Sequence, residues 1–320
     1  MTPRNFRPPK VEQYLYITPD GEEYALHDPP DRFVMFYEGD GLPDIDFGTT
    51  SSPYQHGETV TEVRLLPRTI NMIVRQNGCD RDAYWDLRRD MDNILRPNRT
   101  DVNNPSPGVL RRVTSDGVVR DMDCFVSKGP DYRWTSSGWD EFSIQETLRF
   151  SARNPIMYDP EELMETVAGF QATPSLDTEL IFPFSLPLIF GTTFTTIEKT
   201  LSINYLGNWE EYPTITVSGP ATDLRIEHLQ LGSLISFEGY TIPDGTVVTL
   251  DLSFARKTAI DNLGVSWLGK ISDDSTLGSF RIDCDPLVPD SLNQFLISCV
   301  LGSADTFVQF DYKSRYVGAD

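Results

Sequence analysis

The sequence predicts a mainly β protein that folds as two domains and contains one α-helix. A chain of 320 residues is roughly two domains long, and each half is large enough to bury its own core. From about residue 165 onward, short apolar/polar alternations recur between Gly, Pro and Asp turns roughly every 8 to 12 residues, which is typical of a β-sandwich. Only one stretch, 80–97, has its apolar residues at helical spacing.

The first elements are predicted to be strands separated by a long loop. Residues 10–26 predict a hairpin around the turn at 18–21, where Thr-Pro-Asp-Gly stands. The segment 27–59 is rich in Gly, Pro and Asp, which predicts a loop, and its aromatic residues indicate that it packs on a neighbour. Two strands, 59–66 and 68–76, are then predicted to pair with each other.

A helix is expected next, because the period of the apolar residues changes. Asp80 is a good N-cap and Pro97 stops the helix after Arg96. Strands return at 108–113, 118–126 and 142–152. The apolar stripe predicted to face a sheet consists of Tyr84, Leu87, Met91, Ile94 and Leu95.

The domain boundary is predicted at the two-proline segment 153–160, which separates a domain of residues 1–160 from one of residues 161–320. In the second domain, Ile215 and Val217 alternate with polar residues until Gly219-Pro220 interrupts the run. A second alternation follows through Leu224, Ile226 and Leu229. Such punctuation predicts successive strands of an antiparallel sandwich.

The net charge and the apolar stretches of the sequence restrict the classes of partner that the chain is expected to bind. The chain has 48 Asp and Glu against 27 Lys and Arg, a formal net charge of −21. This field repels phosphate backbones, so the surface is not expected to bind nucleic acid; it favours solubility, or a channel past which a polyanion slides without sticking. No membrane insertion is expected, because the longest apolar stretch, 180–190, is short and holds two prolines. No secretory signal is expected, because no apolar region follows the cationic residues at the N-terminus.

Reactive residues form no recognisable catalytic or metal-binding pattern. The Asp pairs lack the Gly and distal Glu of a calcium loop, and no G-x-S-x-G elbow occurs. We therefore expect no enzyme, no catalytic residue, no cofactor and no metal site. Scattered cysteines with no histidine nearby indicate reduced, buried thiols more than disulfides or zinc ligands. They are Cys79, Cys124, Cys284 and Cys299, and the histidines are His27, His56 and His228.

Aromatic residues of the second domain leave an alternative open. Exposed aromatic rings on a β-sandwich can stack against sugars, although the same residues also suit core or turn packing. The candidates are Trp209, Tyr212, Tyr240 and Trp267.

The order of the predicted elements resembles the distal tail (Dit) proteins of long-tailed bacteriophages with non-contractile tails. In the first half the resemblance is carried by Gln55-His56-Gly57-Glu58, Pro67-Arg68-Thr69-Ile70, the helix ending at Pro97 and Ala152 to Asp159. In the second half it is carried by Pro183-Phe184, Gly207-Asn208-Trp209, Pro213-Thr214-Ile215, Gly219-Pro220-Ala221, Ile235-Ser236-Phe237, Tyr240-Thr241-Ile242, Gly245, Val248 to Asp251, and Phe307 to Phe310 with Tyr316.

The resemblance implies both an architecture and a role. The N-terminal domain would be a tail-tube-like β-sandwich or split barrel with one α-helix, and the C-terminal domain a galectin-like antiparallel β-sandwich. Six copies would form a ring, the baseplate hub, that joins the tail tube protein to tail-tip, tail-fibre or receptor-binding proteins. DNA would pass through this ring without specific binding. The protein would sit at the tail tip of the virion, assembled in the host cytoplasm, and serve host attachment.

Two hypotheses follow. In the first, residues 1 to about 160 carry ring formation, and the loop aromatics Phe36, Phe47 and Tyr54 form an oligomer interface with the adjacent copy. In the second, a carbohydrate-binding β-sandwich protein contacts glycans on the host surface. The chain lacks room for an inserted carbohydrate-binding module, which weighs against direct sugar recognition.

Overall fold

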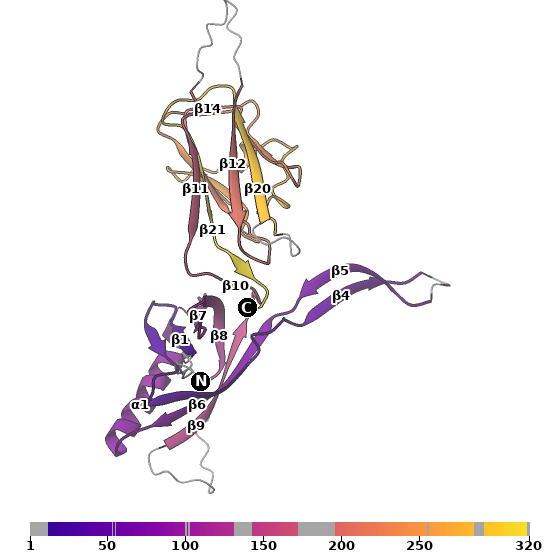
Figure 1. Cartoon of the computed structure of the whole chain (residues 1–320). Coiled ribbons are helices and arrows are strands. Elements are labelled where there is room, and N and C mark those ends of the chain that lie inside the picture. The colour runs from indigo at the N-terminus through magenta and orange to yellow at the C-terminus, as the bar shows by residue number, and fades with distance from the viewer. Residues whose placement is uncertain are drawn as a thin grey trace, which may run out of the picture. The chain divides into compact units, whose positions relative to one another are not determined.

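The computed structural model describes residues 12–318 except 53, 55, 100, 102, 131–142, 172–195, 255 and 285–290. The chain forms two compact units. The first unit runs to Pro160 and also contains the residues from Arg315 onward, and the second unit is Glu161–Ser314. Both are built mainly from antiparallel strands, and α1 (Arg81–Leu95) is the only α-helix in the described part of the chain (Figure 1).

The first unit is organised around one antiparallel sheet with the strand order β2-β1-β7-β8-β9-β6-β3. Two further short strands, β10 and β22, join this sheet through β8. Their bounds are β1 (Gln13–Ile17), β2 (Glu23–Ala25), β3 (Arg32–Glu38), β6 (Arg68–Asn77), β7 (Gly108–Val113), β8 (Val119–Lys128), β9 (Ser143–Ala152), β10 (Met157–Tyr158) and β22 (Arg315–Tyr316).

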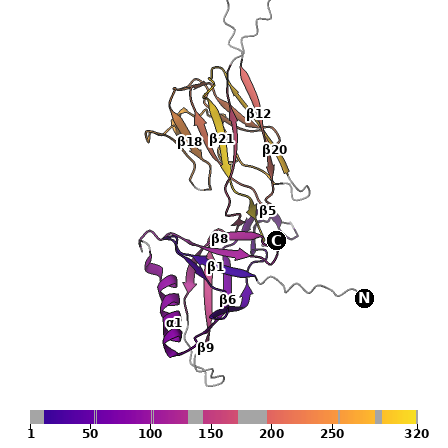
Figure 2. The same cartoon turned by 60° about the vertical axis from the view of Figure 1, so that its left-hand side comes forward.

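Helix α1 begins where the sequence predicts, because the Asp80 carboxylate accepts a hydrogen bond from the Ala83 amide at 2.8 Å. A short 3-10 turn, η1 (Pro97–Arg99), follows its end. The helix lies along one face of the sheet (Figure 2). Its buried residues share a core with the inward-facing residues of β6: Met91, Ile94 and Leu95 from α1, and Ile70, Met72 and Val74 from β6.

The strands at 13–25 and 108–152 agree with the sequence prediction, but the pairing of 59–66 with 68–76 is wrong. Strand β5 (Thr59–Leu65) pairs with β4 (Ile45–Thr50), whereas β6 pairs with β3 and β9. The predicted loop 27–59 therefore contains two strands, β3 and β4. Their alternation is interrupted by a bulge in β3 and by Gly48 in β4, so local sequence hides both of them.

The second unit places two antiparallel sheets around one core. The larger sheet has the order β11-β21-β13-β18-β19, the smaller β12-β20-β15-β16, and β14 pairs with β17. The bounds are β11 (Leu163–Ala168), β12 (Ile197–Tyr205), β13 (Thr214–Ser218), β14 (Ala221–Thr222), β15 (Arg225–His228), β16 (Ser233–Ser236), β17 (Thr241–Ile242), β18 (Val247–Asp251), β19 (Thr258–Asp261), η2 (Leu268–Lys270), β20 (Ser291–Cys299) and β21 (Phe307–Tyr312).

The predicted alternations of this unit are confirmed except at Leu229, where the prediction is wrong, because this residue lies just beyond the end of β15 and is 45% exposed. Ile215, Val217 and Ile226 are fully buried between the sheets. Gly219 ends β13 where the backbone runs against another segment: a Cβ there would lie 2.1 Å from the Pro243 carbonyl oxygen. Three predicted features lie outside the described residues, namely Gln55, Pro183-Phe184 and the apolar stretch 180–190.

The chain returns to the first unit after the second is complete, a connection that the sequence did not predict. Strand β22 pairs with β10, and Tyr316 is buried in the core of the first unit. The Arg120 guanidinium lies 3.6 Å from the centre of the Tyr316 ring, and the Tyr316 hydroxyl donates to Asp159 at 3.1 Å. Arg68 donates to the Val317 carbonyl at 2.7 Å, which fixes the segment further.

Candidate functional site

An exposed apolar surface of the first unit lies on strands β4 and β5, here called the β-arm (residues 45–65). These two strands pair with each other and with no other described strand, and they reach away from the sheet of their own unit (Figure 1). The register sets Ile45 opposite Leu65 and Phe47 opposite Val63. Because directly paired residues point to the same face of a sheet, these four side chains form one apolar face.

A bulge extends this face toward the turn. Gly48 pairs with Glu62 and Thr49 with Val60, so that Thr61 is an extra residue in β5. Without it, Val60 would point to the opposite face from Val63; with it, both valines share the face of Phe47. The other face is polar, and Arg64 and Asp46 form an ion pair there at 2.6 Å.

The apolar face of the β-arm is uncovered in one copy of the chain. Ile45, Phe47, Val60 and Val63 are 46%, 53%, 55% and 61% exposed. A two-stranded hairpin is marginally stable in water by itself, and a contiguous apolar face of this kind marks an interaction surface. The β-arm therefore offers an uncovered apolar surface that suits contact with a partner.

Tyr54 stands in the turn of the β-arm with its side chain fully exposed and a positive φ of 74°. A bulky residue in the left-handed region is uncommon, and such strain is concentrated at functional sites. The turn therefore exposes an aromatic ring to solvent.

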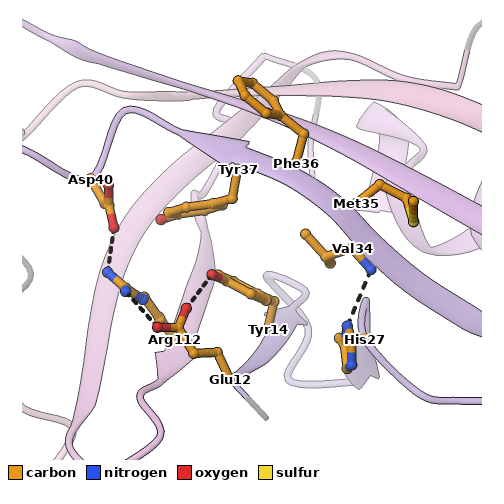
Figure 3. Close-up of a pocket in the computed structure, with 9 residues that line it drawn as sticks. All are labelled: Glu12, Tyr14, His27, Val34, Met35, Phe36, Tyr37, Asp40 and Arg112. Carbon is orange, nitrogen blue, oxygen red and sulfur yellow. Dashed lines mark hydrogen bonds and ion pairs between the residues drawn. The ribbon is translucent and has the colours of Figure 1, made fainter.

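Strand β3 lines a pocket of about 410 Å³ on the same unit, here called the β3 pocket (Figure 3). Apolar and aromatic side chains form one part of its lining and a charged group the other. The lining residues are Glu12, Tyr14, His27, Val34, Met35, Phe36, Tyr37, Asp40 and Arg112. This size and mixture are ordinary for a site that receives a side chain or a small molecule.

The apolar rim of the pocket is produced by a bulge in β3. Val34 pairs with Val74 and Phe36 with Ile73, which leaves Met35 without a ladder partner. Met35 and Phe36 are 55% and 46% exposed. Bulges on edge strands redirect side chains and interrupt pairing, and β3 is the last strand of its sheet among the described residues.

The charged part of the pocket is held together by its own contacts. Arg112 forms ion pairs with Asp40 and with Glu12, the latter at 3.1 Å, and the Tyr14 hydroxyl donates to Glu12 at 2.6 Å. The hydrogen bond from Tyr14 lowers the pKa of Glu12, and Arg112 lowers it further against the effect of burial. Burial raises the pKa of Tyr14, whose ring packs 4.7 Å from that of Tyr37. These groups form a preorganised wall.

The three residues predicted for an oligomer interface stand on separate elements. Phe36 is in β3 at the pocket rim, Phe47 is on the apolar face of the β-arm, and Tyr54 is in its turn. All three are exposed, and their contact with another copy stays a prediction. Sequence reasoning missed Met35 and Val63; the spacing of Ile45 with Phe47 and of Val63 with Leu65 was the available signal.

The four aromatic residues considered for sugar stacking have different environments. Trp267 is buried in the core of the second unit, and its ring nitrogen donates to Asp261 at 3.0 Å. Lys257 lies 4.1 Å from the centre of the Tyr212 ring and occupies that face. Trp209 is half-buried and Tyr240 is exposed, on separate connections. Trp267 therefore cannot stack on a sugar.

Metal-binding side chains do not gather in the described part of the chain: no three of its His, Cys, Asp or Glu residues come together where they would hold an ion. Its cysteines are free thiols, and the predicted burial is confirmed for Cys124 and Cys299, whereas Cys284 is half-buried and the prediction is wrong for Cys79, which is exposed. Among the described residues, no helix has both the length and the apolar character needed to span a membrane.

No protein-family model and no curated protein matches the sequence. The architecture, however, matches the crystal structure of the Dit (gp 19.1) protein of phage SPP1, described as a hub of the adsorption apparatus of phages that infect Gram-positive bacteria. The match covers 96% of this chain and 99% of that one, with a TM-score of 0.57 and 16% identity. The chain has the Dit fold.

Two baseplate structures of phage P2 also align with the chain. The activated baseplate with Ca covers 95% of this chain and 98% of the other, at 12% identity and a TM-score of 0.46. The form with Sr covers 94% and 98%, at 11% identity and a TM-score of 0.43. The Dit-like, mainly β fold class predicted from the sequence is confirmed by the SPP1 structure, across both units of the chain.

Proposed function

We propose that the chain is a structural distal tail protein of a bacteriophage, six copies of which form the baseplate hub ring. The exposed apolar face of the β-arm carries the proposal, because it supplies a surface that only another molecule can bury. The Dit fold over nearly the whole chain supports the assignment to a phage tail. In this role the protein is structural and performs no catalysis.

A ring follows more readily than a symmetric pair. The β-arm reaches away from the sheet of its own unit, and we infer that it meets a different part of the next copy. Contacts between two different surfaces are head-to-tail, and they generate a closed ring when the rotation allows it. Residues 1–160 thus carry ring formation, with Phe36, Phe47 and Tyr54 at the interface.

The second unit, within the predicted domain 161–320, has a closed core and is free to act as a docking domain. It would contact tail-tip, tail-fibre or receptor-binding proteins, while the ring joins the tail tube protein. The net charge of −21 opposes adhesion of DNA, which suits a channel that DNA crosses during ejection without specific binding. Assembly would take place in the host cytoplasm, before the protein joins the virion.

The test is the mass and the image of the purified full chain. We expect a particle of six times the mass of one chain by light scattering, and a ring with a central hole by electron microscopy. Replacing Phe47→Ala together with Val63→Ala should shift the particle toward monomers. Glu62→Ala, on the polar face of the same arm, is the matched control and should leave the ring intact. A chain that stays monomeric at every concentration would contradict the proposal.

A further inference from the structure

We propose that the turn between β15 and β16, residues 229–232, opens when His228 is protonated, while the rest of the second unit stays folded. The turn is therefore a pH-sensitive element within a closed sandwich. This inference concerns the second unit alone and does not depend on the proposed ring.

The hydrogen bonds of Asn293 determine which form of the His228 ring is present. The Asn293 side-chain nitrogen donates to the carbonyls of Asp283 at 3.0 Å and Ser291 at 3.2 Å, and its Oδ1 accepts from the Asp283 amide at 2.8 Å. The same Oδ1 lies 2.8 Å from Nε2 of His228, so Nε2 carries a proton and donates it. In the neutral ring Nδ1 then has the lone pair, and it accepts from the Leu231 amide at 3.2 Å.

Hydrogen bonds hold the turn against β15 and β20. The Leu229 amide donates to the Gln294 carbonyl at 2.9 Å, and the Gln294 amide donates back to Oε1 of Gln230 at 2.9 Å. The bond from the Leu231 amide to Nδ1 of His228 completes the set. It is the one among these three that a proton on the imidazole ring removes.

The turn is the side of the ring that yields. A proton on Nδ1 of His228 would set two N–H donors against each other, and the fully buried ring could not hydrate its charge in place. On one side the ring is confined by β20, where the centre of the Phe295 ring lies 4.6 Å away and the strand pairs along its length with β12. On the other side stands the turn, whose Leu229 and Leu231 are 45% and 37% exposed. Opening of the turn therefore relieves the clash and hydrates the ring.

The direction of the pH effect follows from the surroundings of the ring. Among the described residues, Asp283 favours the protonated ring and Arg281 opposes it, and the residues of β16 and β20 that contact it are uncharged. Burial is the largest effect and lowers the pKa of His228 below its ordinary 6.5 while the turn is closed. The open turn restores the ordinary pKa. Acid below pH 6.5 therefore favours opening, by at most about tenfold per pH unit.

Hydrogen exchange of the full chain at pH 7, 6 and 5 tests the opening, with each rate corrected for the intrinsic pH dependence of exchange. The amides of residues 229–232 should lose protection by up to about tenfold per pH unit below 6.5. The paired amides of β12 and β20 should keep their protection, because their bonds do not depend on the His228 ring.

A pair of matched variants assigns the effect to one side chain. His228→Asn places an acceptor oxygen where the ring has Nδ1 and takes up no proton in this range, so the protection of residues 229–232 should become independent of pH. His27→Asn is the control, because Nδ1 of His27 also accepts from a backbone amide, that of Val34 at 3.2 Å, but in the first unit. It should leave the pH dependence of residues 229–232 unchanged.

The outcomes decide between a local opening and its alternatives. Constant protection of residues 229–232 from pH 7 to pH 5, or a pH dependence that persists in His228→Asn, would overturn the inference. Loss of protection throughout the second unit at the same pH would also overturn it, because the whole sandwich would then unfold.

Nuclear magnetic resonance of the imidazole nitrogens in the unchanged chain gives a second reading, which stands even if His228→Asn does not fold. At pH 7 we expect a neutral His228 ring with its proton on Nε2. A proton on Nδ1 at this pH would contradict the inference, because Nδ1 could not then accept from the Leu231 amide.

Discussion

The two units differ in how their strands are covered. The second unit encloses its core between two sheets, and even its buried histidine is fully hydrogen-bonded: His228 accepts from the Leu231 amide at 3.2 Å and bonds Asn293 at 2.8 Å. The first unit leaves an amphipathic arm outside its core, and it buries Glu146, whose carboxylate oxygens have no hydrogen-bond partner among the described residues.

We expect this difference to separate a self-sufficient module from one that gains stability from its neighbours. We expect a core enclosed between two sheets to need nothing from another copy, so that its stability is independent of protein concentration. A unit with an uncovered apolar arm gains stability when it assembles, by mass action. Three measurements test the contrast, in order of decreasing effect.

The largest effect is expected from Phe295→Ala in the closed core. Phe295 is fully buried, and its ring centre lies 4.6 Å from that of His228 and 4.7 Å from that of Phe310. Removing the ring should lower the free energy of unfolding of the second unit by about 3 to 5 kcal/mol. Chemical denaturation of the full chain at two protein concentrations measures it.

The matched control is Phe254→Ala, since this ring is 82% exposed on the same unit. It should change stability by less than about 0.5 kcal/mol. If the cost of Phe295→Ala varied with protein concentration, the second unit would not be self-sufficient.

A smaller effect, of opposite sign, is expected from Glu146→Gln in the first unit. Burial raises the pKa of Glu146 from its ordinary 4.5 to about 8, Arg88 opposes this and Asp92 adds to it. The folded state therefore keeps a proton that the unfolded state releases, and stability is lost as pH rises from 4.5 to 8.

The neutral side chain of Gln should raise the free energy of unfolding by roughly 3 kcal/mol at pH 7, and this gain should vanish near pH 4.5. Urea unfolding of the full chain at both pH values, with the exposed Glu58→Gln as control, provides the measurement. An equal gain at both pH values would show that the carboxylate charge is not responsible.

The smallest effect concerns His228. Burial lowers its pKa below the ordinary 6.5, although the hydrogen bond with Asn293 opposes this, so the folded state holds the ring neutral. Below pH 6.5 the unfolded state takes up a proton that the folded state refuses, and stability falls by at most about 1.4 kcal/mol per pH unit. Unfolding of the second unit followed at pH 7, 6 and 5 should show this decline; a flat profile would contradict the assignment.

The elements that depend only on neighbouring residues in the sequence were predicted correctly. The capping residue Asp80, the stripe through Met91 and the stop at Pro97 place α1 within a residue or two. The pairing of β5 is different, because Leu66-Pro67 suggests a turn to β6, whereas the true partner is β4. Which strands pair depends on residues that are distant in the sequence, so the local pattern of apolar residues does not predict the partner.

The sequence predicted which types of residue form the candidate site, but not the strands that carry them. The aromatic residues Phe36, Phe47 and Tyr54 predicted that the segment 27–59 packs on a neighbour. The same segment was predicted to be a loop, whereas the structure has a bulged edge strand and an amphipathic arm there. The bulges at Met35 and Thr61 break the alternation that would have indicated both strands. The two bulges therefore orient the exposed side chains and also remove the alternating pattern by which the strands could have been predicted.

The late return of the chain to the first unit sets an order of synthesis. Tyr316 belongs to the core of that unit, yet a ribosome reaches it only after the whole of the second unit has been made. A nascent or truncated chain therefore lacks the contacts of Tyr316 with Arg120 and Asp159, and its first unit stays unfinished. The first unit therefore closes its core late in synthesis, once Tyr316 has been made.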